Sequence, residues 1–302
     1  MPEPVCQNAN FTFPDLSRVL SNGTYFGGNV SAYDWTVDKG NVINTNSSGG
    51  ELAMLLTETN GGTLMSSTRY VHYGQITARV KTGRWAGVVT AFITMSDIKD
   101  EIDWEFPGAN TTAGQSNYFW QGLVAEPTNG ETTGGLTDTF SNYHDYTIDW
   151  KPDSLTWSID GTAVRTLQAS DTKGPDGVVR YPNTPSRIQF SIWPAGINSS
   201  AAGTVAWAGG MINWQDPDYV AAGHFYALVQ SINITCEDPV PPAAGVTSYV
   251  YSTNASAFTP QINFSNATTI NAAGSLMELG GVWGIRSTVA FVVFLGIFGV
   301  LF

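Results

Sequence analysis

The sequence predicts an all-β protein built from antiparallel strands. Short runs rich in Val, Ile, Thr, Tyr and Trp recur across residues 20 to 236 and are separated by Gly, Asn and Asp-Gly. These runs show little of the 3.6-residue period of an amphipathic helix. The chain of 302 residues can bury one sizeable core, and a β-sandwich of this length is commonly a single domain.

Four parts follow one another along the chain. Residues 1–19 form an N-terminal segment, and residues 20–236 form the β domain. Inside that domain Asp160-Gly161 separates two strand-like runs and predicts a hairpin. Residues 237–270 open with three prolines and carry further glycosylation signals, so we expect a glycosylated stalk with one strand near residues 248–251. Residues 271–302 are the fourth part.

The stretch of residues 100–106 contains the candidate catalytic residues. Side chains alternate between the two faces of a strand, so Glu101, Asp103 and Glu105 share one face while large apolar residues occupy the other. Retaining glycoside hydrolysis needs two carboxyl groups about 5–5.5 Å apart, one as nucleophile and one as acid and base. Crowding of three carboxylates raises the pKa of at least one of them. The alternative is an ordinary half-buried strand with a solvated acidic face.

This acidic run resembles the catalytic signature of glycoside hydrolase family 16, and its flanks resemble the Crh-type fungal cell-wall transglycosylases. The resembling stretches are residues 69–70, 73–74, 79–81, 115–119, 143–150, 156–161, 181–185 and 203–210. The resemblance implies a concanavalin-like β-sandwich, or jelly roll, of two curved antiparallel sheets with a concave sugar groove. It implies Glu101 as nucleophile, Asp103 as assisting carboxylate and Glu105 as acid/base. Ala195 stands where the family leads us to expect glycine.

The expected activity is retaining transglycosylation of cell-wall polysaccharides, with chitin as donor and a glucan or chitin as acceptor. An endo-β-glucanase uses the same carboxylates with water as acceptor, and a non-catalytic wall lectin is the alternative from another class. The crowded acidic triad argues against the lectin, because binding alone does not require it.

Aromatic side chains are the expected sugar platforms, because sugar rings present apolar C–H faces. The candidates for stacking are Tyr118, Phe119, Trp120, Trp193, Trp207 and Trp214. Gln115 and Asn117 are expected to hydrogen-bond sugar hydroxyls, and His144 is a candidate substrate contact with a structural hydrogen bond as its alternative. Trp150 and Trp157 lie in alternating patterns that favour the core.

The composition indicates which classes of partner the protein can bind. The net charge of −12 argues against nucleic acid and anionic membranes and fits a neutral polysaccharide. His72, His144 and His224 are too dispersed for a metal site, so we expect no bound metal. We also expect no cofactor, and we expect the protein to be a monomer.

Secretion is indicated by cysteines and sequons. Cys6 and Cys236 bracket the β domain and are expected to form a disulfide, with two buried free thiols as the alternative. Asn-x-Ser/Thr sequons occur at Asn10, Asn22, Asn29, Asn46, Asn110, Asn198, Asn233, Asn254, Asn263 and Asn266.

The last segment resembles a targeting signal. Residues 288–302 are apolar, fewer than the roughly 20 residues of a spanning helix, and small residues precede them around Asn271. This pattern is typical of a GPI-attachment signal with Asn271 as anchor site, and a short tail-anchor helix is the alternative. Such a signal requires entry into the secretory pathway, so we expect a leader that was removed or missed before Met1.

Overall fold

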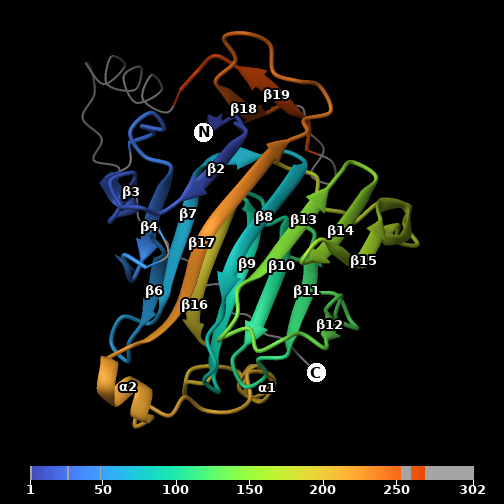
Figure 1. Ribbon diagram of the computed structural model, residues 1–302. Helices are drawn as coiled ribbons and strands as arrows, with labels where there is room; N and C mark the ends of the chain where they lie inside the picture. The colour runs from blue at the N-terminus through green and yellow to red at the C-terminus, as the bar shows by residue number, and fades with distance from the viewer. Residues whose placement is uncertain (1, 26, 48, 253–259, 269–302) are drawn as a thin grey trace, which may run out of the picture.

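The computed structural model describes residues 2–25, 27–47, 49–252 and 260–268, and its main body is a sandwich of two large sheets (Figure 1). The first sheet has the strand order β12 (Glu131–Gly134), β11 (Ala113–Phe119), β10 (Glu101–Pro107), β9 (Val88–Ser96), β16 (Ser186–Pro194), β7 (Thr63–Val71), β4 (Trp35–Lys39) and β3 (Val19–Leu20). The β3–β4 pair is parallel, whereas the other pairs of this sheet are antiparallel.

The second sheet packs against the first and is the nearer of the two in Figure 1. Its strand order is β15 (Thr162–Gln168), β14 (Ser154–Ile159), β13 (His144–Trp150), β8 (Gly74–Lys81), β17 (Phe225–Cys236), β6 (Leu52–Leu56) and β5 (Asn41–Asn44). Strand β2 (Ala9–Thr12) also pairs with β17. The all-β sandwich predicted from the sequence is therefore confirmed.

The core lies between the two sheets and is rich in tryptophan. Trp104, Trp150 and Trp157 are fully buried, as expected for Trp150 and Trp157. Each indole N–H donates to a backbone carbonyl: Trp104 to Thr147, Trp150 to Pro182 and Trp157 to Asp103. Because buried indoles need such partners, the core also fixes the register of the two sheets.

The predicted hairpin joins β14 and β15. Asp160 and Gly161 both have positive φ, 50° and 78°, which is the left-handed geometry of a type I′ turn. The turn matches the right-handed twist of the flanking strands, which explains the Asp-Gly dipeptide.

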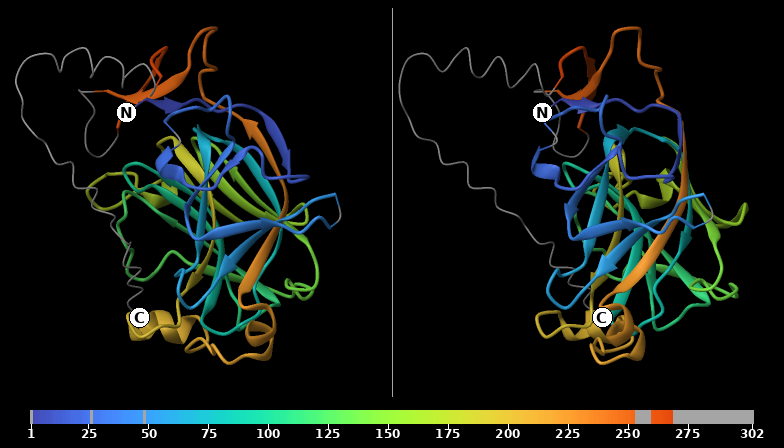
Figure 2. Two further views of the ribbon diagram at one scale, coloured as in Figure 1. Left: turned by 90° about the vertical axis from the view of Figure 1, so that its left-hand side faces the viewer. Right: turned by 60° about the vertical axis from the view of Figure 1, so that its left-hand side comes forward.

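Small elements close the two ends of the sandwich, as the two side views in Figure 2 show. At one end a third sheet is formed by β1 (Glu3–Pro4), β18 (Ser248–Tyr251) and β19 (Ile262–Ser265), and β18 occupies the residues where a strand was expected. Helices α1 (Ala202–Trp207) and α2 (Pro217–Ala222) lie at the opposite end (Figure 1). Short 3₁₀ turns occur at η1 (Gly23–Tyr25) and η2 (Ala169–Thr172).

A disulfide joins Cys6 to Cys236 with a Cα–Cα distance of 5.9 Å across 230 residues of chain. It ties the end of β17 to the segment between β1 and β2. The predicted disulfide is therefore present, and the alternative of two free thiols is wrong. In the part of the chain that the structure describes, no helix combines the length and apolar character needed to cross a bilayer.

The described sequons lie on the surface. Asn29 is half-buried, and the exposed ones are Asn10, Asn22, Asn46, Asn110, Asn198, Asn233, Asn263 and Asn266. Asn10 and Asn233 are direct cross-strand partners on β2 and β17. Asn254, Asn271 and residues 288–302 lie outside the described residues.

Candidate active site

Strand β10 presents its three carboxylates on one face. Ile102, Trp104 and Phe106 are buried in the core between the sheets, so Glu101, Asp103 and Glu105 point away from the second sheet. We call this side of the first sheet the carboxylate face. The indole of Trp157 holds the backbone carbonyl of Asp103 from the core side at 3.0 Å. The packing of the apolar residues thus determines where the three carboxylates point.

Burial makes these carboxylates hard to ionise. Glu101 and Asp103 are 7% and 1% exposed. Desolvation raises the pKa of Glu101 to about 7, while Lys99 and a hydrogen bond with Asp103 oppose the rise. Desolvation, with the charge of Glu101, raises the pKa of Glu105 to about 8. The pKa of Asp103 is also raised, first by desolvation and then by both glutamates. The site can therefore keep a proton at neutral pH beside an ionised carboxylate, as general acid catalysis requires.

This arrangement predicts a pH-dependent cost to stability. The pKa of Glu105 is about 8 in the folded protein against an ordinary 4.5, so the folded state binds more protons than the unfolded state between these values. Stability therefore falls as the pH rises through that window. Glu105→Gln removes the buried charge and should raise the thermal midpoint more at about pH 9 than at about pH 4. An equal gain at both pH values would contradict this cause.

Strand β11 places predicted binding residues beside the triad. Gln115 pairs with Glu105, Asn117 with Asp103 and Phe119 with Glu101, so these three lie on the carboxylate face. Tyr118 does not, because it pairs with Ile102 and is 8% exposed on the core side. There its ring lies 5.8 Å from the Arg165 guanidinium. The expectation that Tyr118 stacks on sugar is not supported, since alternate residues of a strand face opposite ways.

Two tryptophans form an aromatic pair next to these residues. The rings of Trp193 and Trp207 stack with centroids 6.0 Å apart and an interplanar angle of 24°. Trp207 Nε1 donates to Gln115 Oε1 at 2.7 Å, which orients the amide and leaves its NH2 group to donate elsewhere. Ala195 is fully buried and packs with Val89 and Ala208 against this pair. Its methyl group therefore supports the indoles from behind.

The position of Trp193 predicts an effect on substrate affinity. Trp193→Ala should raise the KM for oligosaccharides about fivefold or more, because an aromatic platform contributes about 1 kcal/mol beyond its buried area, with little change in kcat. Steady-state kinetics with a set of oligosaccharide lengths would measure this. Val220→Ala, at an exposed position of α2, is a suitable control. A loss confined to kcat would argue against a platform.

An arginine on the carboxylate face, Arg187, was not foreseen from the sequence. Arg187 pairs with Met95, which in turn pairs with Glu101. Arg187 also donates to Thr36 at 2.8 Å and lies 3.6 Å from Asp38. The alternation of polar and apolar residues in 186–194 was a signal for this face, but its place beside the triad depends on a register that the sequence does not reveal.

The remaining candidates have structural partners. His144 lies on β13 in the other sheet, where Nδ1 is 2.7 Å from Asp160 and Nε2 is 3.0 Å from Thr137. It is not brought to the triad, and the structural alternative accounts for it. Trp120 is buried with Arg180 over its ring, and Trp214 packs on Tyr219 and Phe225. Within the described residues, no cluster of His, Cys, Asp and Glu side chains is suited to hold a metal ion.

Comparison with known proteins places this geometry in context. A family model described as glycosyl hydrolases family 16 matches residues 29–209. The chain is 42% identical over 84% of its length to Congo red hypersensitive protein 2 of Saccharomyces cerevisiae, and 38% identical over 93% of its length to Crh-like protein 3 of Botryotinia fuckeliana. It spans 54% and 63% of those two proteins. A solved structure titled Crh5 transglycosylase in complex with NAG matches with a TM-score of 0.68 and 29% identity over 87% of this chain and 95% of that chain.

Proposed function

Because the chain belongs to glycosyl hydrolase family 16, we propose that it is a retaining transglycosylase of cell-wall polysaccharides. The observation that carries the proposal is the carboxylate triad on β10, in which Glu101 and Glu105 have raised pKa values of about 7 and about 8. The aromatic pair and Gln115 supply a sugar platform on the same face.

The reaction has two steps. In the first, a carboxylate oxygen of Glu101 attacks the anomeric carbon of a β-linked donor, and Glu105 gives its proton to the leaving oxygen. In the second, a hydroxyl of the acceptor glycan attacks the same carbon while Glu105 takes its proton, and the Glu101 carboxylate is released. Asp103 lies between the two glutamates and hydrogen-bonds Glu101.

Chitin is the proposed donor, and a glucan or chitin chain is the proposed acceptor. Support comes from the solved relative, whose title names a transglycosylase in complex with NAG. A plain endo-β-glucanase would use the same triad with water as acceptor, so the carboxylates alone do not distinguish the two reactions.

Product analysis tests the proposal. The protein is incubated with chitin oligosaccharides and a fluorescently labelled glucan acceptor, and the products are separated by length. Hybrid products longer than the acceptor are expected. Shortened donor without hybrids would indicate a hydrolase, and binding without any change in length would indicate a lectin. Glu101→Gln is the matched inactive control.

We further propose a location at the fungal cell surface through a GPI anchor at Asn271, on the strength of the apolar run at residues 288–302 and the small residues around Asn271. Treatment of intact cells with a phospholipase that cleaves GPI anchors should release the protein when transfer to the wall is blocked. Recovery of Phe302 in the mature chain would contradict this prediction. Replacing Asn271 and Gly274 by bulky residues should leave the precursor unprocessed.

A further inference from the structure

The residue before the nucleophile is a fully buried carboxylate, Asp100. Its Oδ2 accepts hydrogen bonds from the Asn183 N–H at 3.0 Å and from the Thr184 hydroxyl at 2.7 Å. Its Oδ1 accepts a hydrogen bond from the Gln121 N–H at 3.0 Å. One carboxylate therefore joins three segments: the turn before β10, the loop after β11 and the loop before β16.

The same contacts fix Lys99, on the other side of Asp100. The Gly122 N–H donates to the Lys99 carbonyl at 2.7 Å, so the loop that Asp100 binds through Gln121 also binds the Lys99 backbone. Lys99 and Gln121 both have positive φ, 74° and 51°, a conformation that is unfavourable without such support. The Lys99 charge lowers the pKa of Glu101. Asp100 thus lies between the nucleophile and the cation that favours its ionised form.

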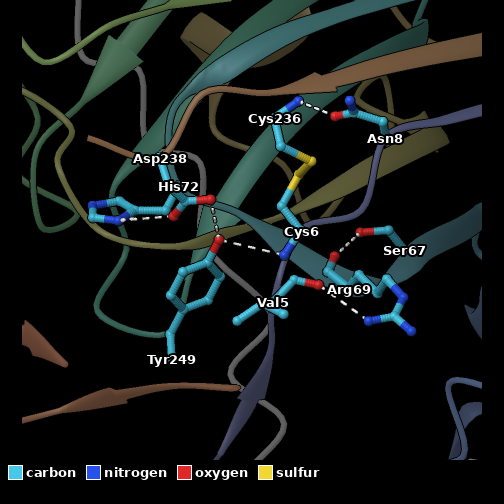
Figure 3. Close-up of a disulfide and its surroundings, with 9 residues drawn as sticks. All are labelled: Val5, Cys6, Asn8, Ser67, Arg69, His72, Cys236, Asp238 and Tyr249. Carbon is cyan, nitrogen blue, oxygen red and sulfur yellow. Dashed lines mark hydrogen bonds and ion pairs between the residues drawn. A yellow bond between two sulfur atoms is a disulfide. The ribbon is translucent and has the colours of Figure 1, made fainter. Parts of the chain in front are cut away.

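The contacts extend from Asp100 to the small third sheet. The Asn183 carbonyl accepts from His72 Nε2 at 3.1 Å. Burial lowers the pKa of His72 to about 4, so the ring is neutral and its Nδ1 faces Asp238 at 3.8 Å. Figure 3 shows Asp238 accepting from the Tyr249 hydroxyl, which in turn accepts from the Cys6 N–H. Hydrogen bonds therefore connect the turn before β10 as far as His72, and the contacts among Asp238, Tyr249 and Cys6 lie next to that ring.

From these contacts we infer that Asp100 is a positioning residue, which holds Glu101 in attacking geometry and keeps Lys99 next to it through the loops at residues 121–122 and 183–184. This inference rests on the proposed role of Glu101 as nucleophile. The charged groups around Glu101 are Asp103 and Glu105 on its own strand, Lys99 in the preceding turn and Arg187 two strands away. Met95 and Phe119, its direct cross-strand partners, do not titrate.

The test uses Thr184→Val and Thr184→Ser, because the first removes the hydroxyl that binds Asp100 and the second keeps it. An activated fluoro-sugar of the chitin series labels the nucleophile, and the labelling rate is measured against pH and sugar concentration. Thr184→Val should lower the saturating rate per active site at least fivefold, move the acid limb to higher pH and leave the affinity for the sugar within twofold. Thr184→Ser should restore both values, and Asp100→Asn should resemble Thr184→Val.

Thr82→Val is the control for the general loss of a buried hydroxyl, because Thr82 is buried and its hydroxyl is paired with that of Thr139 at 2.6 Å and not with Asp100. It should label at the wild-type rate and pH. A wild-type rate and acid limb in folded Thr184→Val, or equal losses in Thr82→Val, would overturn the positioning role. Failure of the wild type to be labelled at Glu101 would instead overturn the proposed function, and this inference with it.

Discussion

Glu101→Gln is expected to lower turnover by about 10⁴-fold or more, since loss of a covalent nucleophile has effects of this order in other hydrolases. The change is nearly isosteric and removes only the attacking charge. Because the apolar residues of β10 carry the packing, the fold and the sugar affinity should remain. Binding of a chitin oligosaccharide, measured by calorimetry, is the control that separates loss of chemistry from loss of structure.

Glu105→Gln should be nearly as inactive on natural glycans but should differ in one respect. With a substrate whose leaving group needs no protonation, Glu101 should still be glycosylated, because only the acid has been removed. Asp103→Asn should fall between the two variants and shift the acid limb of the pH profile, since Asp103 hydrogen-bonds Glu101. Labelling of Glu105 by a fluoro-sugar would reverse the two roles. Wild-type activity in both glutamine variants would exclude the proposed enzymatic function of this site.

Removal of the disulfide should have the largest effect on stability. Cys6 and Cys236 close a loop of 230 residues, for which chain-entropy estimates give about 5 kcal/mol. The double variant Cys6→Ser/Cys236→Ser should therefore unfold about 10–20 °C below the wild type. Reductant should lower the wild-type midpoint to that of the variant and leave the variant unchanged. A midpoint that reductant does not move would show that the bond contributes little.

The β10 motif shows what local sequence can predict. Its alternation of carboxylates and large apolar residues predicted a strand and its two faces correctly, because side-chain direction in a strand alternates with residue number. The Asp-Gly turn was predictable for a similar reason, since it requires positive φ at both residues. Both features are set by neighbours in the sequence.

Tyr118 was predictable from its neighbours in the sequence, whereas the places of His144 and Arg187 depended on contacts between distant segments. Tyr118 was grouped with Gln115, Asn117 and Phe119 although the period of two already placed it on the other face. For His144 the sequence could not reveal Asp160 and Thr137 as partners, which required the β13 register and the following hairpin. The place of Arg187 on the carboxylate face, two strands from Glu101, also becomes clear only when the strand order β10, β9, β16 is known.

The bond between Cys6 and Cys236 also makes the catalytic unit a covalent ring, because nearly all of the sandwich lies between the two sulfurs. A single cut by a protease at any exposed loop within this ring opens it without dividing it into two molecules. Exposed positions such as Leu123 and Val124 are loop sites where such a cut could fall. A sandwich closed in this way can be cut once by a protease and still keep all of its strands attached to one another.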